Sequence, residues 1–199
     1  MDNKIIEFGE LNSSQKEQAV ELFLEGFGSF MTFSKNEEKK KALFLEIFDP
    51  TLFLCYVDDE KVLGLLGLGT NKVRPINFKK EICQKYFGKF KGAIIAKQMN
   101  PIFQKPAVSD DKELYIDTIV VDPNYRNKGI GTILLNKAAE YGIFNNLVLE
   151  VFSKNQTAIS FYKKNCFTIK REKKMSFMSL FGSGYPIVMV KSLNSYEEI

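Results

Sequence analysis

Apolar and polar positions alternate along this chain in patterns typical of strands and helices, and residues 113–142 give the clearest example. An apolar run from Leu114 to Val121, rich in Ile and Val, has the length of a buried strand. Turn-forming residues 122–124 predict its end. A helical pattern follows, with Ile130, Leu134, Ala138 and Tyr141 on one face, and Gly142 stands where a glycine often follows a helix. The segment is therefore predicted to fold as strand, glycine-containing loop and helix.

The same periodicities predict the rest of the chain. Strands are expected at residues 5–8, 52–57, 61–69, 147–152, 167–174 and 185–191. Helices are expected at residues 14–27 and 36–47, at two places within 75–105, and from an Asn155 cap onward. Asn12, Ser13 and Ser14 are N-cap candidates for the first helix, and Ser14 and Glu17 have the spacing of a capping box.

The loop between Arg126 and Gly131 is a candidate anion-binding site. Main-chain N–H groups converge where a helix begins, and the helix dipole is positive there, so the site suits phosphate oxygens. A glycine allows the phosphate to approach the main chain closely. A Walker loop needs Gly-Lys-Ser/Thr, and the dinucleotide fingerprint needs a third glycine where Leu134 stands. An ordinary glycine-containing turn stays open as the alternative at this point.

Composition narrows the chemistry. The 199 residues suit one domain, and the net charge of +4 is too mild to argue for nucleic acid. The chain contains no histidine, which excludes Ser–His and Cys–His catalysis and histidine metal sites. Its three cysteines are scattered without CxxC spacing, so neither a disulfide framework nor a metal site is predicted, and a reducing cytoplasm is the simple interpretation. The sequence shows no signal peptide pattern and no apolar stretch near the roughly 20 residues that a membrane span needs.

Two motifs resemble those of the GNAT superfamily of acyl-CoA-dependent N-acetyltransferases. The first is Arg126-x-x-Gly129-x-Gly131 after a strand ending in Val-x-Pro. The second comprises Leu149, Val151, Asn155, Ala158, Phe161, Tyr162 and Phe167, with Cys166 in place of the usual glycine. The resemblance is close over residues 113–167 and looser in the flanking segments.

This resemblance implies an α/β (α+β) GNAT fold, with a central mixed, mostly antiparallel, splayed sheet and helices on both faces. Residues 1–199 would form a single domain with a helical insertion at about 75–105. The implied reaction is transfer of an acetyl group from acetyl-CoA to a primary amine by direct attack in a ternary complex. A non-catalytic acyl-CoA-binding sensor is the alternative. The insertion could cover the acceptor site, form a subunit contact, or be a surface elaboration whose seven lysines are solvated.

Residue by residue, the resemblance also implies a cofactor site. The main chain of Ile119, Val120 and Val121 would hydrogen-bond the pantetheine arm like an added strand. The pyrophosphate would be held by Arg126, Asn127, Lys128, Gly129, Ile130, Gly131 and Thr132. Asn155 would bind the pantetheine or thioester region, and Tyr162 would stand beside the thioester sulfur.

The candidate catalytic groups are Tyr162 and Glu150. A tyrosine, with an unperturbed pKa of about 10, stays protonated at neutral pH and can give a proton to the departing thiolate. Glu150 is the first candidate base, because a carboxylate on an otherwise apolar strand needs a reason. Asp117 in the neighbouring strand is the second candidate base, acting through water, and a candidate substrate-binding residue. For Tyr162, simple packing beside Phe161 stays open as the alternative. For Glu150 and Asp117, the alternative is a structural or substrate-orienting role.

The acceptor is expected to be a small-molecule or peptide amine, without nucleic acid, membrane or metal, and a homodimer is possible. Phe27 and Phe30 are candidate lining residues of its pocket, in a cluster with Met31 and Phe33 that core packing would also explain. The loop 181–184 often reaches the acceptor in this family. The sequence does not identify the amine.

Overall fold

A computed structural model gives the fold of this chain and describes residues 4–174 and 184–193. Its seven-stranded sheet has the order β1-β2-β3-β4-β5-β7-β6. The strands are β1 (Lys4–Glu7), β2 (Phe53–Asp58), β3 (Lys61–Gly69), β4 (Glu113–Val121), β5 (Asn146–Phe152), β6 (Thr168–Glu172) and β7 (Pro186–Ser192). Strands β4 and β5 run parallel, and every other neighbouring pair of this sheet is antiparallel. The predicted loop 181–184 lies outside the described residues, apart from Gly184.

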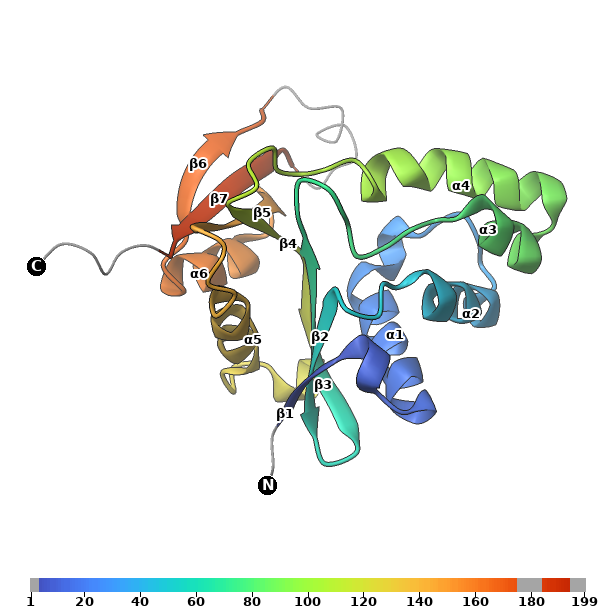
Figure 1. The fold of residues 1–199 in the computed structure, drawn as a ribbon, viewed down its shortest axis with the longest axis horizontal. Coiled ribbons are helices and arrows are strands. Elements are labelled where there is room, and N and C mark those ends of the chain that lie inside the picture. The colour runs from blue at the N-terminus through green and yellow to red at the C-terminus, as the bar shows by residue number, and fades with distance from the viewer. Residues whose placement is uncertain (1–3, 175–183, 194–199) are drawn as a thin grey trace, which may run out of the picture.

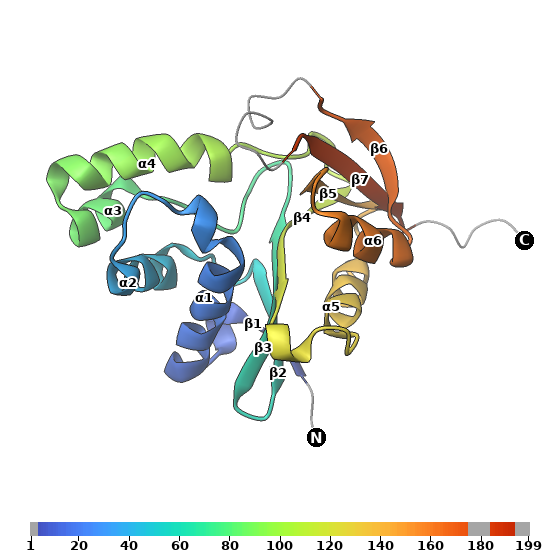
Figure 2. The ribbon, with the colours of Figure 1, turned by 180° about the vertical axis from the view of Figure 1, so that it is seen from behind.

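Helices cover both faces of the sheet, as Figures 1 and 2 show from opposite sides. They are α1 (Ser13–Phe27), α2 (Glu37–Ile47), α3 (Lys80–Phe87), α4 (Lys89–Phe103), α5 (Ile130–Ala139) and α6 (Gln156–Lys164). Short 3-10 helices span Phe8–Glu10, Gly28–Phe30 and Pro123–Tyr125. Helices α1 to α4 lie on one face, and α5 and α6 lie on the other. Within the described ranges, no helix combines the length and apolar character that crossing a membrane requires.

Two large apolar cores follow from this layering, beside a small third cluster that contains Tyr115 and Val148. One lies between the sheet and α1 to α4, and its fully buried side chains include Phe23, Phe44 and Phe78. The other lies between the sheet and α5 and α6, around Leu134 and Phe167. These observations confirm the predicted fold class.

The start of α1 and the end of α5 differ from the prediction. The capping box is made by Asn12 and Gln15, because the Asn12 side chain accepts from the Gln15 N–H at 2.9 Å and the Gln15 side chain accepts from the Asn12 N–H at 3.2 Å. Ser14 therefore lies inside the helix. Helix α5 ends at Ala139, and Gly142 lacks the left-handed conformation that a glycine after a helix adopts.

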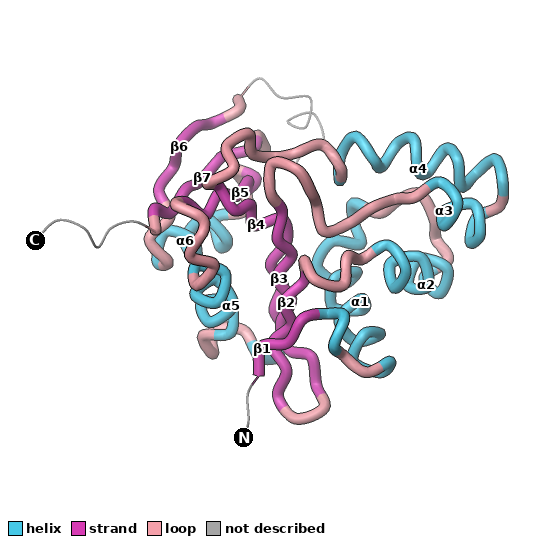
Figure 3. Tube along the Cα trace, in the orientation of Figure 1, coloured by secondary structure: helices cyan, strands magenta, loops and turns pink. Residues whose placement is uncertain are grey.

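The segment 75–105 forms the two predicted helices, α3 and α4. Its inward face joins the first core through Phe78, Cys83 and Ile95, so it is more than a surface elaboration. Figure 3 shows the two long loops that connect this helical pair to β3 and β4. The outer face of α4 exposes Phe90 and Ile94. The predicted homodimer stays a prediction.

Candidate active site

Strands β4 and β5 pair over only part of their length. Their parallel register runs from Glu113 opposite Asn146 to Ile116 opposite Leu149. Beyond that point β4 continues beside β3, and β5 continues beside β7. Residues 117–121 therefore present a strand edge toward β5 that no described strand covers. This is the splayed sheet that the prediction required.

A β-bulge lies at the point where the two strands part. Leu68 of β3 opposes Ile116 and Gly67 opposes Thr118, so Asp117 is an extra residue on β4. Bulges often re-aim a side chain near a functional site. Here the Asp117 carboxylate forms an ion pair with Arg74, and both side chains are buried. Burial raises the pKa of Asp117, and the hydrogen bond from Arg74 opposes that rise.

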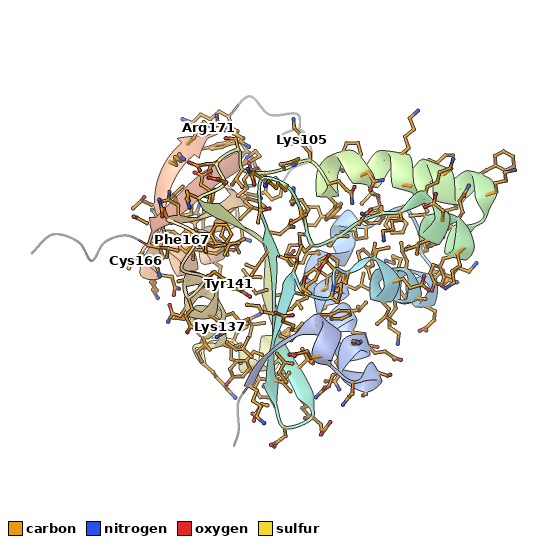
Figure 4. All side chains as sticks on the ribbon, in the orientation of Figure 1. Lys105, Lys137, Tyr141, Cys166, Phe167 and Arg171 are labelled. Carbon is orange, nitrogen blue, oxygen red and sulfur yellow. The ribbon has the colours of Figure 1, made fainter. Side chains whose placement is uncertain are left out.

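Sequence patterns alone did not identify Arg74 as part of the candidate site. Its Nη1 donates to the main-chain oxygen of Lys105 at 2.7 Å, and its guanidinium lies 5.1 Å from the centre of the Tyr115 ring. It therefore joins both ends of the 75–105 segment to the bulge; Figure 4 labels Lys105 just beyond the end of α4. One feature of the sequence could have drawn attention to it, because only three of the 28 basic residues are arginines. An arginine makes several directed hydrogen bonds in a buried pair, which a lysine cannot reproduce.

The loop before α5 presents its main-chain N–H groups without partners. Among the described residues, none of the amides of 126–132 donates to a protein acceptor. Gly129 has a φ of 84° and Asn127 a φ of 62°, and helix α5 begins at the next residue, Ile130. Arg126 Nε donates to the Val121 oxygen at 3.2 Å, and the Lys128 ammonium lies 4.5 Å from the centre of the Tyr125 ring. The arrangement can receive an anion of several oxygens.

The two glycines of this loop have different roles. A Cβ at Gly129 would meet no protein atom within 4 Å, so the space above it is open. A Cβ at Gly131 would lie 2.9 Å from Cζ of Phe161. Gly131 is therefore required by the packing of α5 against α6, in addition to any effect on a ligand.

Tyr162 is held by helix α6. The helix starts as predicted, with the Asn155 side chain accepting from the Ala158 N–H at 3.0 Å. Tyr162 is buried between Phe161 and Phe167, at ring-centre distances of 5.3 and 5.6 Å. Burial raises the pKa of its hydroxyl above the usual value, so the group stays protonated well beyond neutral pH. No other described residue makes a hydrogen bond to that hydroxyl.

The end of α6 fixes Tyr162 through a Schellman motif. The Phe167 N–H donates to the Tyr162 oxygen at 3.0 Å, and the Cys166 N–H donates to the Lys163 oxygen at 3.1 Å. Cys166 has a φ of 67°, the left-handed conformation in which a glycine is usual. Figure 4 shows Cys166 and Phe167 side by side at the end of this helix.

We expect Cys166→Gly to stabilise the fold. The exchange removes the left-handed strain of a residue with a Cβ, offset in part by the greater chain entropy of glycine, for a net gain of about 0.5–1 kcal/mol. Urea unfolding followed by circular dichroism measures this gain, and Cys166→Ala is the control because it keeps the Cβ. Equal stability of the two variants would contradict the account.

Tyr115 precedes the bulge on β4, and its register partner on β5 is Val148, two residues before Glu150 on the same face. Burial raises the pKa of Tyr115, and the charges of Asp117 and Glu150 act in the same direction, as does Tyr162. Glu150 is the first residue of β5 beyond the last pair with β4, and its carboxylate forms an ion pair with Lys173. Register and ion pairing therefore place Asp117 and Glu150 where β4 and β5 part, with Asp117 engaged by Arg74 and Glu150 by Lys173. Tyr162 belongs to the core on the α5–α6 side of the sheet.

The two candidate lining residues lie in different surroundings. Phe30 is 49% exposed, and its ring stacks on Phe152 at 6.1 Å between centres. Phe152 lies two residues from Glu150 on the same face of β5. Phe27 instead stacks on Phe23 at 5.3 Å and packs against the first core, as do Met31 and Phe33. The geometry favours Phe30 as a lining residue and core packing for the other three.

Comparison with known proteins identifies the protein family. The model of the acetyltransferase (GNAT) family matches residues 17–166, and the chain belongs to this family. It is 41% identical over 69 residues to N-alpha-acetyltransferase 50 of Danio rerio, a match that spans 33% of this chain and 41% of that protein. The fold is similar to that of Ard1 from Thermoplasma volcanium, with a TM-score of 0.54, 18% identity and coverage of 96% and 98% of the two chains. It is also similar to the ribosomal-protein-S18-alanine N-acetyltransferase of Escherichia coli, with a TM-score of 0.51, 15% identity and coverage of 96% and 94%.

Proposed function

We propose that this chain transfers an acetyl group from acetyl-CoA to a primary amine by direct attack within a ternary complex. The observation that carries the proposal is the row of unpartnered amides at residues 126–132, next to a strand edge that the parting of β4 and β5 leaves uncovered. A diphosphate with an extended amide-bearing arm fits both features at once. Membership of the GNAT family supports this ligand over other phosphates.

The loop and the strand edge would bind different parts of acetyl-CoA. The amides of Asn127 to Thr132 would hold the pyrophosphate, helped by the positive end of the α5 dipole. Arg126 and Lys128 add positive charge, and neither forms an ion pair with another described residue. The main chain of Ile119 to Val121 would bind the pantetheine arm as an added strand. The second hydrogen-bonding group of Asn155, its amide NH2, makes no hydrogen bond to another described residue and could bind the same arm.

Acetyl-CoA supplies an activated acyl group, and the chain supplies the proton transfers. Glu150 would accept a proton from the acceptor amine, which must be neutral to attack. Tyr162 would give a proton to the departing thiolate. Burial raises its pKa, which keeps the hydroxyl protonated at neutral pH and also makes it a weaker acid than an exposed tyrosine. Asp117 would act as a structural carboxylate that keeps the bulge in place, since Arg74 already engages it.

The acceptor class is an amine with an apolar neighbour. The stacked pair of Phe30 and Phe152 supports an apolar contact on the face that carries Glu150. Peptide N-termini and small amines both meet that description. The names of two similar proteins, an N-alpha-acetyltransferase and a protein-alanine N-acetyltransferase, favour a peptide α-amine.

The experiment that tests the function measures thiol release from acetyl-CoA across a panel of peptides and small amines. The wild-type chain is expected to turn over at least one amine. Its affinity for acetyl-CoA is measured in parallel. Gly129→Val should weaken acetyl-CoA binding by about 10- to 100-fold, through the loss of one hydrogen bond to a charged group at roughly 1.5–3 kcal/mol. Isothermal titration measures that affinity without turnover.

Gly88→Val is the matched control for this variant. Gly88 has a φ of 81° and a ψ of 164°, a conformation that residues with a Cβ tolerate less well than the left-handed one of Gly129, and it also has no atom within 4 Å of an added Cβ, so its substitution strains the backbone at least as much. Only the Gly129 variant should lose affinity. Equal losses in both variants would refute the phosphate-loop assignment. Tight binding of acetyl-CoA without turnover of any amine would favour the acyl-CoA sensor instead.

A further inference from the structure

Lys173 places a primary amine of this chain on the candidate base. Its ammonium forms an ion pair with Glu150, and the two side chains are 34% and 29% exposed. Lys173 directly follows β6, and its N–H donates to the Pro186 oxygen of β7 at 2.8 Å. The residue is therefore anchored through its main chain, while its amine reaches across β7 to β5.

The position of this contact matters because it lies at the point where β4 and β5 part. The proposed phosphate loop follows the far end of β4, beyond Val121. A bound arm that starts at that loop and follows β4 back for about 13 Å, or four residues, reaches the bulge at Asp117. The acyl end would thus arrive beside Glu150, the first residue of β5 without a β4 neighbour.

The neighbouring lysines are engaged elsewhere. Lys170 forms an ion pair with Glu113 at 3.0 Å, and Lys174 forms one with Glu172 at 3.2 Å. Of these three lysines, Lys173 alone contacts the candidate base. We propose that Lys173 occupies the ammonium position of the acceptor site and is itself acetylated by this chain. The inference rests on the proposed acetyltransferase function.

The reaction balances without any further reactant. Glu150 takes a proton from the Lys173 ammonium, and the neutral nitrogen attacks the carbonyl carbon of the acetyl thioester. The new C–N bond forms, the C–S bond breaks, and the thiolate takes a proton from Tyr162. The attacking nitrogen loses its second proton, which returns Tyr162 to the neutral form, and Glu150 releases the first proton to solvent. The net change converts an ammonium and a thioester into an amide, a thiol and one released proton. Because acetylation removes the lysine charge, the ion pair ends and Glu150 is free for an external amine.

Peptide mapping by mass spectrometry tests the proposal on the full chain incubated with acetyl-CoA and no added amine. The acetyl group should appear on Lys173 at least about tenfold faster than on Lys170 or Lys174, because only Lys173 is positioned at the base. The rate constant should not change with protein concentration. Glu150→Gln should abolish the preference for Lys173, and Lys174→Arg is the matched control that should leave it intact.

The outcomes separate this inference from the function on which it rests. Acetylation of the three lysines at similar rates, or at the rates seen in heat-denatured protein, overturns the inference. If thiol release with external amines still occurs in that case, the proposed function stands. If neither Lys173 nor any external amine is acetylated, both are refuted.

Discussion

Tyr162→Phe is expected to lower kcat by about 10²- to 10⁴-fold, the usual contribution of a positioned general acid. The variant keeps the buried ring between Phe161 and Phe167, so the fold and the cofactor affinity should change little. What it removes is a hydroxyl to which no other described residue makes a hydrogen bond, which leaves that group available to a substrate atom. Steady-state kinetics together with titration of acetyl-CoA binding measure the two effects separately.

The pH profile adds a second readout for this residue. A general acid works only while protonated, and burial raises the pKa of Tyr162 above its ordinary value of about 10. The wild-type kcat should therefore show no loss from tyrosine ionisation up to about pH 10. Tyr141→Phe is the control: Tyr141 follows α5 and packs, partly buried, against the second core, it is not a candidate site residue, and loss of its hydroxyl should leave kcat unchanged. Unchanged turnover in Tyr162→Phe would assign the proton to water or another group.

The fold was largely predictable because its strands and helices carry strong local signals. Strand β4 and helix α5 each have a clear apolar pattern, and the glycines mark the loop between them. Helix boundaries were less predictable, since several adjacent residues could serve as caps. Asn12 and Ser14 are both suitable N-caps, and only the reciprocal bonds with Gln15 decide between them.

The candidate site was predictable where the main chain carries the role, and less so where distant side chains meet. The amides of the loop follow from the local sequence. The pairing of Arg74 with Asp117 joins residues 43 positions apart through a bulge that no periodicity reveals. The contact of Lys173 with Glu150 likewise depends on the strand order β5-β7-β6. Such long-range contacts need the assembled sheet.

Arg74→Met is expected to destabilise the fold by about 3–5 kcal/mol, the cost of leaving a buried carboxylate without its partner. Asp117 is 5% exposed at the side chain, so water cannot replace the guanidinium. The variant also loses the 2.7 Å hydrogen bond to Lys105 and the contact with the Tyr115 ring, which hold the ends of the α3–α4 segment. Unfolding by denaturant at pH 7 measures the loss.

Two comparisons show whether the buried charge causes this loss. Without Arg74, burial should raise the folded-state pKa of Asp117 further above the unfolded value of about 3.9, so the penalty begins above that pH and grows toward neutrality. The variant should therefore lose less stability at pH 4 than at pH 7. Lys137→Met breaks an exposed pair with Glu140 and should cost under about 1 kcal/mol at either pH. The double variant Arg74→Met, Asp117→Leu removes both charges, so it should recover much of the lost stability. If the double variant is as unstable as Arg74→Met alone, the loss comes mainly from the anchoring of the α3–α4 segment and not from the unpaired carboxylate.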